Sequence, residues 1–310
     1  MIQVMKYKSI YLLISAILFA ASVGALLVFG LKPGIDFSGG SLLEYSFSEQ
    51  RPDIAEIQNV LSPLDLGTVV IQPTKERGVI IRTRFVTEAE HQNILLAVRG
   101  AFSSSTVATT TGMAVLEERV ETVGPSISAQ LRERALGVAV VTVLMTLSYI
   151  GYAFRRVSKP VASWKYGTVA IAAMIYNIIV IIGLFAILGR YAGVEVDIPF
   201  VVALMTVFGY SINDTIVVFD RVRENIHRYH GEAFSDIVNR GINETIVRSL
   251  TTGGATLLVL AALFLFGGAT IHYFALALIV GILFGTSSSI FVASSILVAW
   301  EEWRQKRRLA

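Results

Sequence analysis

The sequence contains no cysteine, and only 16% of its 310 residues are charged. The absence of cysteine excludes disulfides, thiolate metal sites and cysteine nucleophiles. Soluble globular domains usually carry about 25% charged residues, whereas 54% of this chain is hydrophobic. Charge is therefore too scarce for an ordinary soluble protein, and the composition favours an integral membrane protein.

Long hydrophobic runs take the place of the missing charge. A membrane-spanning helix needs about 20 mainly apolar residues to cross a hydrocarbon core roughly 30 Å thick. Six segments meet this requirement: 10–31, 135–154, 167–188, 199–219, 249–266 and 271–300. The first follows Lys6 and Lys8 like a secretory signal, but its apolar run is longer than the hydrophobic region of a usual signal. The sequence therefore predicts a bundle of six transmembrane helices, the first of them a retained anchor.

Basic residues are distributed unequally among the segments between the predicted spans. They gather before the first span, in 155–165, in the loop 220–248 and in the tail 301–310, whereas the short loops 189–198 and 267–270 hold only Arg190. Because lysine and arginine accumulate on cytoplasmic flanks, we expect both termini in the cytoplasm and the segment 32–134 outside. The net charge of +3 then requires no nucleic-acid partner.

The segment 32–134 is the one water-exposed stretch long enough to fold by itself. Its residue patterns predict strands over 41–47, 68–72 and 78–85, and extended chain over 106–111 and 113–120. Helices are predicted over 53–61 and from Thr87 to Arg99, the second opened by a capping box of Thr87 and Glu90. The order β-α-β-β-α-β is typical of an α+β ferredoxin-like domain.

This domain shows no convergent catalytic set. Its hydroxyl-rich run over 103–111 lacks a plausible base, and we expect His91 on the polar face of its helix. The spacing of Gly34, Gly39 and Gly40 does not form a phosphate-binding loop. Elsewhere, His227 and His230 lack an obvious third ligand. We therefore expect no enzyme activity, no metal site and no organic cofactor.

An acidic residue lies inside the fourth predicted span. Asp214 is about six residues, or roughly 9 Å, from the cytoplasmic end of that span. An acid at the centre of a membrane helix costs on the order of 2.5–3.5 kcal/mol, and such residues are proton-relay candidates by default. The alternative is a structural interhelical hydrogen bond, helped by Asn213 and Ser211.

Arg248 opens the fifth predicted span. If the fourth and fifth spans are adjacent and antiparallel, Arg248 can pair with Asp214, or instead with Asp220 or Glu224, or it can extend to the interface. Thr252, one turn deeper, can support a water chain or bond to its own backbone. The expected proton relay consists of Asp214, Arg248, Asn213 and Thr252.

Two features accompany the expected relay. A charged cluster ends the fourth span and contains Asp220, Arg221, Arg223 and Glu224. It is followed by an expected amphipathic helix over 232–248, broken or kinked near Gly241. In the last span, small residues recur every four positions: Gly281, Gly285, Ser289 and Ala293. Such a ridge permits close helix packing, and we expect it to carry no chemistry.

Four segments resemble motifs of the SecD/SecF family. The segment 34–40, with Gly34, Asp36, Gly39 and Gly40, is similar to a signature shared by SecD and SecF. The segment 121–126, with Gly124 and Pro125, is similar to the stem motif of the family. Segments 209–225 and 248–252 resemble the fourth-span and fifth-span motifs of SecF. The resemblance extends from about Lys6 to Trp303.

This resemblance implies an RND-superfamily bundle in the bacterial inner membrane, with five clustered spans after the external domain. Members pair with SecD and associate with the SecYEG translocon, often with YajC and YidC. They contact the translocating preprotein and membrane lipid, and they use the proton-motive force to assist translocation after SecA has acted. The resemblance also implies that Asp214 and Arg248 take part in proton flow, with the proton as coupling ion.

Two other functions are compatible with a polar membrane bundle. A passive translocon scaffold would hold components together without proton coupling. An RND efflux half-transporter would use the same type of bundle, but it usually has a larger external domain and a second repeat in the same chain.

Overall fold

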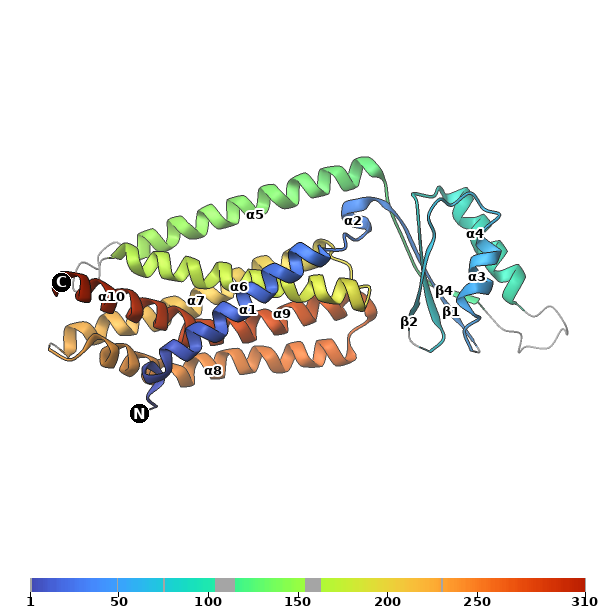
Figure 1. Ribbon diagram of the computed structural model, residues 1–310. Coiled ribbons are helices and arrows are strands. Elements are labelled where there is room, and N and C mark those ends of the chain that lie inside the picture. Colours follow the sequence, from blue (N-terminus) through green and yellow to red (C-terminus); the bar gives the residue numbers. More distant parts are fainter. Residues whose placement is uncertain are drawn as a thin grey trace. The chain divides into compact units, whose positions relative to one another are not determined.

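The computed structural model describes residues 2–48, 50–74, 76–103, 115–153, 163–229 and 231–309. The chain divides into two compact units, which are coloured along the sequence in Figure 1. One unit is Pro33–Leu136, close in extent to the segment 32–134. The other combines Met1–Lys32 with Gly137–Ala310.

The larger unit is a bundle of long helices. Within the described residues, five stretches are long and apolar enough to cross a membrane: Val4–Phe29, Trp164–Tyr191, Ile198–Arg228, Phe234–Phe266 and Ile271–Arg307. They contain α1 (Lys8–Phe29), α6 (Ser163–Tyr191), α7 (Ile198–Arg228) and α8 (Phe234–Phe266). The last stretch joins α9 (Ala269–Ser287), a π-helical turn η2 (Ser288–Ala293) and α10 (Ser294–Leu309).

A long apolar helix thus lies at five of the six predicted spans. The segment 135–154 belongs to α5 (Pro125–Ala153), a helix of 29 residues that begins ahead of the predicted span. That α5 crosses the membrane stays a prediction.

The helices α7 and α8 are longer than the spans predicted for them. α7 continues to Arg228 and α8 begins at Phe234, so most of the expected loop 220–248 is helical. α8 runs through Gly241 as one continuous helix, so a break there is wrong, whereas a kink near Gly241 stays a prediction. Gly241 instead permits a close approach of the two helices, because a Cβ at this position would lie 2.9 Å from Cγ2 and 3.3 Å from Cα of Val222.

α7 is buried along most of its length. Its buried positions run from Phe200 to Ile226 along one stripe with helical spacing. α7 packs against α6, α8, α9 and η2. Because α7 contacts four neighbouring elements, polar side chains on its buried stripe can bind residues from more than one of them.

The smaller unit contains a four-stranded antiparallel sheet within its described residues. Strands β1 (Gly40–Phe47), β2 (Val70–Thr74), β3 (Gly78–Thr83) and β4 (Val115–Val123) lie in the order β2-β3-β1-β4. Helices α3 (Ile54–Leu61) and α4 (Glu88–Phe102) cover one face of the sheet (Figure 1). The element order matches the predicted β-α-β-β-α-β. The predicted segment 106–111 lies outside the described residues.

The core of the smaller unit forms between this sheet face and the two helices. Leu43 and Tyr45 of β1 and Ile81 of β3 meet Ile57 of α3 and Ile94 of α4 there, all fully buried. Alternation along β1 sends every second side chain to this face. The predicted helical and strand periodicities therefore converge on one core.

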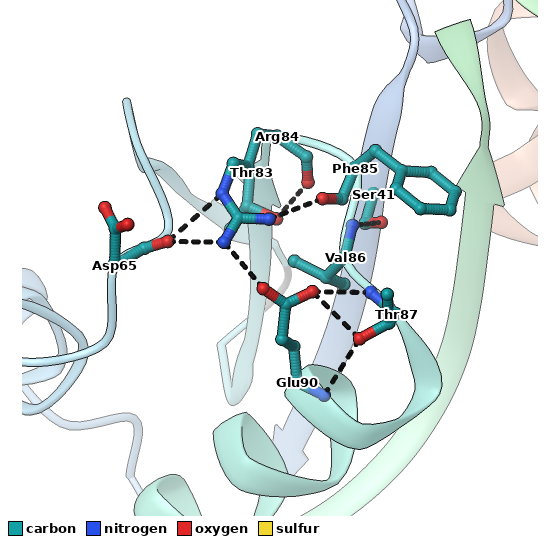
Figure 2. A network of polar contacts seen from close by, with 8 residues as sticks. All are labelled: Ser41, Asp65, Thr83, Arg84, Phe85, Val86, Thr87 and Glu90. Atoms are coloured by element: carbon teal, nitrogen blue, oxygen red, sulfur yellow. Dashed lines mark hydrogen bonds and ion pairs between the residues drawn. The ribbon is translucent and has the colours of Figure 1, made fainter. Parts of the chain in front are cut away.

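The start of α4 is held by a network of polar contacts (Figure 2). Thr87 Oγ1 accepts a hydrogen bond from the Glu90 amide, and Glu90 Oε2 accepts one from the Thr87 amide, as the predicted capping box requires. Arg84 donates to Glu90 Oε1 at 2.6 Å and to the Asp65 carbonyl oxygen. The hydrogen bond from Arg84, followed by those from Thr87, lowers the pKa of Glu90 to about 2. The network ties the loop after α3 to the end of β3 and to α4.

His91 corrects one expectation for this helix. Its side chain is buried against β4 instead of lying on a polar face, because His91 shares the inward stripe of Ile94, Leu95 and Val98. Nε2 contacts the Glu117 carboxylate, and Nδ1 lies 3.4 Å from Glu88 Oε1. Burial opposes the charged form of His91, but the two carboxylates outweigh it and raise the pKa of the imidazole above its usual value of 6.5.

Candidate functional site

The carboxyl group of Asp214 joins three helices inside the bundle. The Asp214 residue is only 9% exposed. Its Oδ1 accepts a hydrogen bond of 2.5 Å from Ser249 Oγ of α8. Its Oδ2 accepts a short hydrogen bond from Ser289 Oγ of the π-helical turn η2. Both carboxylate oxygens are therefore bound by hydroxyls from other helices.

Asp214 reaches the interior because of its position in the α7 repeat. Val207, Ser211 and Val218 occupy the same buried stripe, in which successive members, Asp214 included, are three or four residues apart. Such intervals place side chains on one face of a helix. The sequence around Asp214 thus builds a core-facing stripe and inserts one ionisable group into it.

Small residues of α9 bring the last predicted span close to this stripe. A Cβ on Gly281 would lie 2.1 Å from Cγ2 of Val207, and one on Gly285 would lie 3.4 Å from Cβ of Ser211. Ser289 follows four residues later and binds Asp214. The predicted ridge therefore lies along α7 at these positions, and Ser289 adds a polar contact that sequence reasoning did not assign to it.

A second buried polar contact lies one turn away from Asp214. Asn177 of α6 is fully buried, and its Nδ2 donates to Ser211 Oγ at 2.6 Å. Asn177 and Ser249 were not among the predicted site residues, and Ser289 was predicted for helix packing alone. The signal for Ser249 was available, because it continues the stripe of Ile242 and Thr245 on α8.

The other predicted relay residues do not join this site. Asn213, Arg248 and Thr252 are all exposed on the described bundle. Within the described residues, no ion pair joins Arg248 to Asp214, and Ser249 provides the contact from α8 instead. Successive residues of an α-helix point about 100° apart, so burying Ser249 turns Arg248 outward.

The charged cluster after Asp214 connects α7 to α8. Arg221 Nε lies 2.7 Å from Glu244 Oε2, and Arg221 also contacts Glu224. Arg223 and Asp220 form a looser pair at 3.6 Å along α7. Exposed ion pairs contribute little to stability because water and salt screen them, so the cluster adds modestly to this helix contact. Glu244 was not predicted as a member.

The two glycine-containing signatures meet in the smaller unit. Gly39 and Gly40 have φ values of +73° and +128°, and a Cβ on Gly40 would lie 2.6 Å from the Thr83 carbonyl oxygen. These values lie in the left-handed region that favours glycine. Because β1 pairs with β4, Gly40 lies opposite Val123, just before Gly124 and Pro125.

The remaining signature residues lie at the ends of short elements. Gly34 precedes α2 (Ile35–Ser38), which contains a half-buried Asp36. Pro125 opens α5, and its carbonyl oxygen accepts a hydrogen bond of 3.0 Å from the buried Ser128. The described residues contain no group of three His, Asp or Glu side chains suited to a metal ion. His230, one of the two histidines considered as ligands, lies outside them.

Comparison with known proteins identifies the family. The profile of "Protein export membrane protein SecD/SecF, C-terminal" matches residues 103–303, and that of "SecD/SecF GG Motif" matches residues 24–50. The protein translocase subunit SecF of Thermobaculum terrenum is 39% identical, with 97% of this chain and 94% of that protein covered. The chain belongs to the SecF family. SecF of Vibrio alginolyticus is 36% identical, with 94% and 87% covered.

Solved structures agree with membership in the SecF family. The crystal structure of SecDF from Thermus thermophilus matches with a TM-score of 0.81 and 29% identity, over 96% of this chain and 38% of the SecDF chain. SecDF in a super-membrane-facing form matches with a TM-score of 0.69 and 29% identity, over 99% and 39%. This SecF-family chain is thus a multi-pass membrane protein of protein export, and it corresponds to less than half of a SecDF chain.

Proposed function

We propose that this SecF-family chain pairs with SecD and uses the proton-motive force to assist SecYEG- and SecA-dependent protein translocation across the bacterial inner membrane. In this proposal both termini are cytoplasmic, and Pro33–Leu136 is a periplasmic ferredoxin-like domain. YajC and YidC are further candidate partners. The proposal involves no catalytic residue and no cofactor, because the proton itself is the coupling ion.

The observation that carries the proposal is the position of Asp214. An ionisable group inside a membrane bundle is costly and marks a proton or ion path by default. This one also receives hydroxyl contacts from α8 and η2 at the same time. A change in its protonation therefore acts on the contacts of three helices.

Protonation would reverse part of this hydrogen-bond arrangement. A carboxylate accepts hydrogen bonds only, whereas a carboxylic acid also donates one. When Asp214 takes up a proton, one of the two serine hydroxyls must therefore turn away or become an acceptor. The contacts between α7 and its neighbours then change, which we propose moves the helices and, through them, the external domain relative to SecD.

The available energy is sufficient for such a change. One proton that crosses about 100 mV supplies about 2.3 kcal/mol. That amount shifts a two-state equilibrium by about 50-fold. A small rearrangement of the bundle can thus be driven by a single proton.

Asn213, Arg248 and Thr252 remain members of the proposed relay. All three are exposed in this chain alone. We assign them to the surface that the spans of SecD cover, where a charged arginine and two polar side chains would line a path to Asp214. Their contribution then depends on the assembled complex.

A passive scaffold is the second candidate function. It is favoured by the satisfied hydrogen bonds of Asp214, which also suit a purely structural link between helices. It predicts that Asp214→Asn preserves export, whereas Gly285→Leu, which fills the space beside Ser211, prevents assembly. Membership in the SecF family argues against an efflux half-transporter.

Gradient-dependent export in reconstituted vesicles separates these functions. Vesicles would contain SecYEG, SecD and this chain, with SecA and ATP supplied and a proton gradient imposed or omitted. Asp214→Asn is expected to lose the gradient-dependent part of export and to keep the ATP-dependent part. The matched control is Asp220→Asn, the same chemical change at an exposed position of α7. Unchanged gradient-dependent export in Asp214→Asn would overturn the proposal.

A further inference from the structure

The Ser289 hydroxyl lies between two hydrogen-bond acceptors. Its Oγ contacts Asp214 Oδ2 and also lies 2.9 Å from the carbonyl oxygen of Thr286, three residues earlier in its own helix. A serine hydroxyl has a single proton and can donate to one acceptor at a time. Ser289 therefore has two alternative arrangements that need only a rotation about its side chain.

Ser249, the other partner of Asp214, differs in this respect. Its hydroxyl donates to Asp214 Oδ1, and the described residues offer it no second acceptor within hydrogen-bond distance. Both serines bind the same carboxylate, but only Ser289 has an alternative bond ready. Ser249 thus only binds Asp214, whereas Ser289 can also change partner when the charge of Asp214 changes.

Ser289 also lies in an unusual stretch of backbone. The residues Ser288–Ala293 form a π-helical turn between α9 and α10. Turns of this type are rare inside α-helices and occur frequently at functional sites. The Ser289 carbonyl oxygen accepts a hydrogen bond of 3.1 Å from Ser294 Oγ, five residues later. Both the side chain and the carbonyl of Ser289 are therefore engaged at this turn.

Among the described residues, few ionisable groups lie on the helices around Asp214. On α7, Tyr210 is one turn away, and Asp220 and Arg221 are about two turns away. On α8, Arg248 is exposed and Glu244 pairs with Arg221. On α6, Tyr176 is adjacent to Asn177. On α9 and η2, the ionisable residues are His272 and Tyr273, more than four turns before Ser289.

We propose that the Ser289 hydroxyl changes its hydrogen-bond partner when Asp214 gains or loses a proton. This change alters the contact between Asp214 and the π-helical turn. When Asp214 is charged, Ser289 donates to Oδ2 and holds the last helix against α7. When Asp214 takes up a proton on Oδ2, the acid donates to Ser289 Oγ, and the hydroxyl proton turns to the Thr286 carbonyl oxygen. The hydrogen bond between α7 and η2 then has Asp214 as donor and Ser289 as acceptor. This change occurs at the turn where the backbone departs from the α-helical pattern. Ser289 is thus a positioning residue for the relay, and the inference rests on the proposed proton coupling.

The test is an infrared titration of the full chain in lipid nanodiscs. The protonated Asp214 carboxyl band is identified by its loss in Asp214→Asn. Ser289→Ala removes a donor to the charged form, and a hydrogen bond to a charged group is strong enough to move the midpoint by about one pH unit or more, toward higher pH. Ser289→Thr, which keeps the hydroxyl, is expected to titrate close to the parent protein.

Ser288→Ala is the matched control in the same turn. The Ser288 hydroxyl is equally buried, but it donates to the Gly285 carbonyl oxygen of its own helix. This variant is expected to leave the midpoint unchanged. An unchanged midpoint in Ser289→Ala, an equal shift in Ser288→Ala, or an Asp214 carboxyl that does not titrate would each overturn the inference.

Export measured with the same variants separates this inference from the proposed function. Asp214→Asn could lose gradient-dependent export while Ser289→Ala keeps both its export and the titration midpoint of Asp214. In that case the proposed proton coupling is supported and the role of Ser289 is wrong. If Asp214→Asn keeps gradient-dependent export, the proposed function fails, whatever the titration shows. Loss of gradient-dependent export in Ser289→Ala together with its recovery in Ser289→Thr supports both.

Discussion

Ser249 of α8 donates a hydrogen bond of 2.5 Å to Asp214 of α7, and its neighbour Arg248 is exposed. An ion pair between Arg248 and Asp214 was expected between α8 and α7, but a hydrogen bond from the Ser249 hydroxyl joins the two helices instead. This leaves the carboxylate without a cation from the described part of the chain. Within the described residues, the hydroxyls of Ser249 and Ser289 bind the two oxygens of this carboxylate.

Ser249→Ala is expected to destabilise the bundle when Asp214 is charged. Removing a partner from a buried polar group costs about 1–3 kcal/mol, and more when that group carries a charge. Thermal unfolding in detergent should show a lower midpoint temperature at neutral pH, and a smaller loss in acid where the carboxylate is neutralised. Ser249→Thr is the control, because it retains the hydroxyl. Equal stability of Ser249→Ala and the parent protein at neutral pH would contradict the contact.

Gly281→Ala is expected to disturb the contact between α9 and α7. The added Cβ would lie 2.1 Å from Cγ2 of Val207, and overpacking of this type costs about 1–3 kcal/mol. Gly254→Ala on α8 is the matched control, because its Cβ meets no atom within 4 Å. Thermal unfolding should show a loss for the first variant alone, and Val207→Ala should recover part of it. Equal stability of the two glycine variants would mean that the close approach does not exist.

His91→Gln is expected to change the pH dependence of the external domain. Glu117 and Glu88 raise the pKa of His91 above 6.5 despite its burial. A raised pKa in the folded state contributes stability that is fully present below the unfolded value of about 6.5 and is lost as pH rises through the folded value. Hydrogen exchange of α4 in the full chain, corrected for intrinsic rates, should show greater protection below that range.

The His91→Gln variant should lose this pH dependence of α4. Asn93→Ala on the same helix is the control, because Asn93 is exposed. A parent protein whose α4 protection does not change across neutral pH would contradict the role of His91.

Much of this fold follows from local sequence patterns. The apolar runs predict five of the helices found in the bundle, and Thr87 with Glu90 marks the start of α4 through a local capping box. These features depend on residues close together in the chain, so periodicity and capping rules detect them. The burial of His91 was missed because it depends on which face of α4 meets the sheet.

The site was predictable only in its central residue. Asp214 is noticeable because an acid in an apolar run is costly. Its partners Ser249 and Ser289 lie 35 and 75 residues away in the chain, and serines in membrane helices are common at packing interfaces. Their roles depend on how far α8 and η2 rotate about their axes. Sequence spacing alone does not specify that rotation, so the prominent Arg248 was favoured over Ser249.

Proton flux through the reconstituted complex shows whether Asp214 carries protons. Vesicles with SecD and this chain would carry a trapped pH-sensitive dye, and a proton gradient would be imposed across them. Proton entry above that of empty vesicles is expected for the parent protein and for Asp220→Asn, and entry near the background for Asp214→Asn, with SecD still bound. Equal proton entry for Asp214→Asn and the parent protein would contradict this role of Asp214.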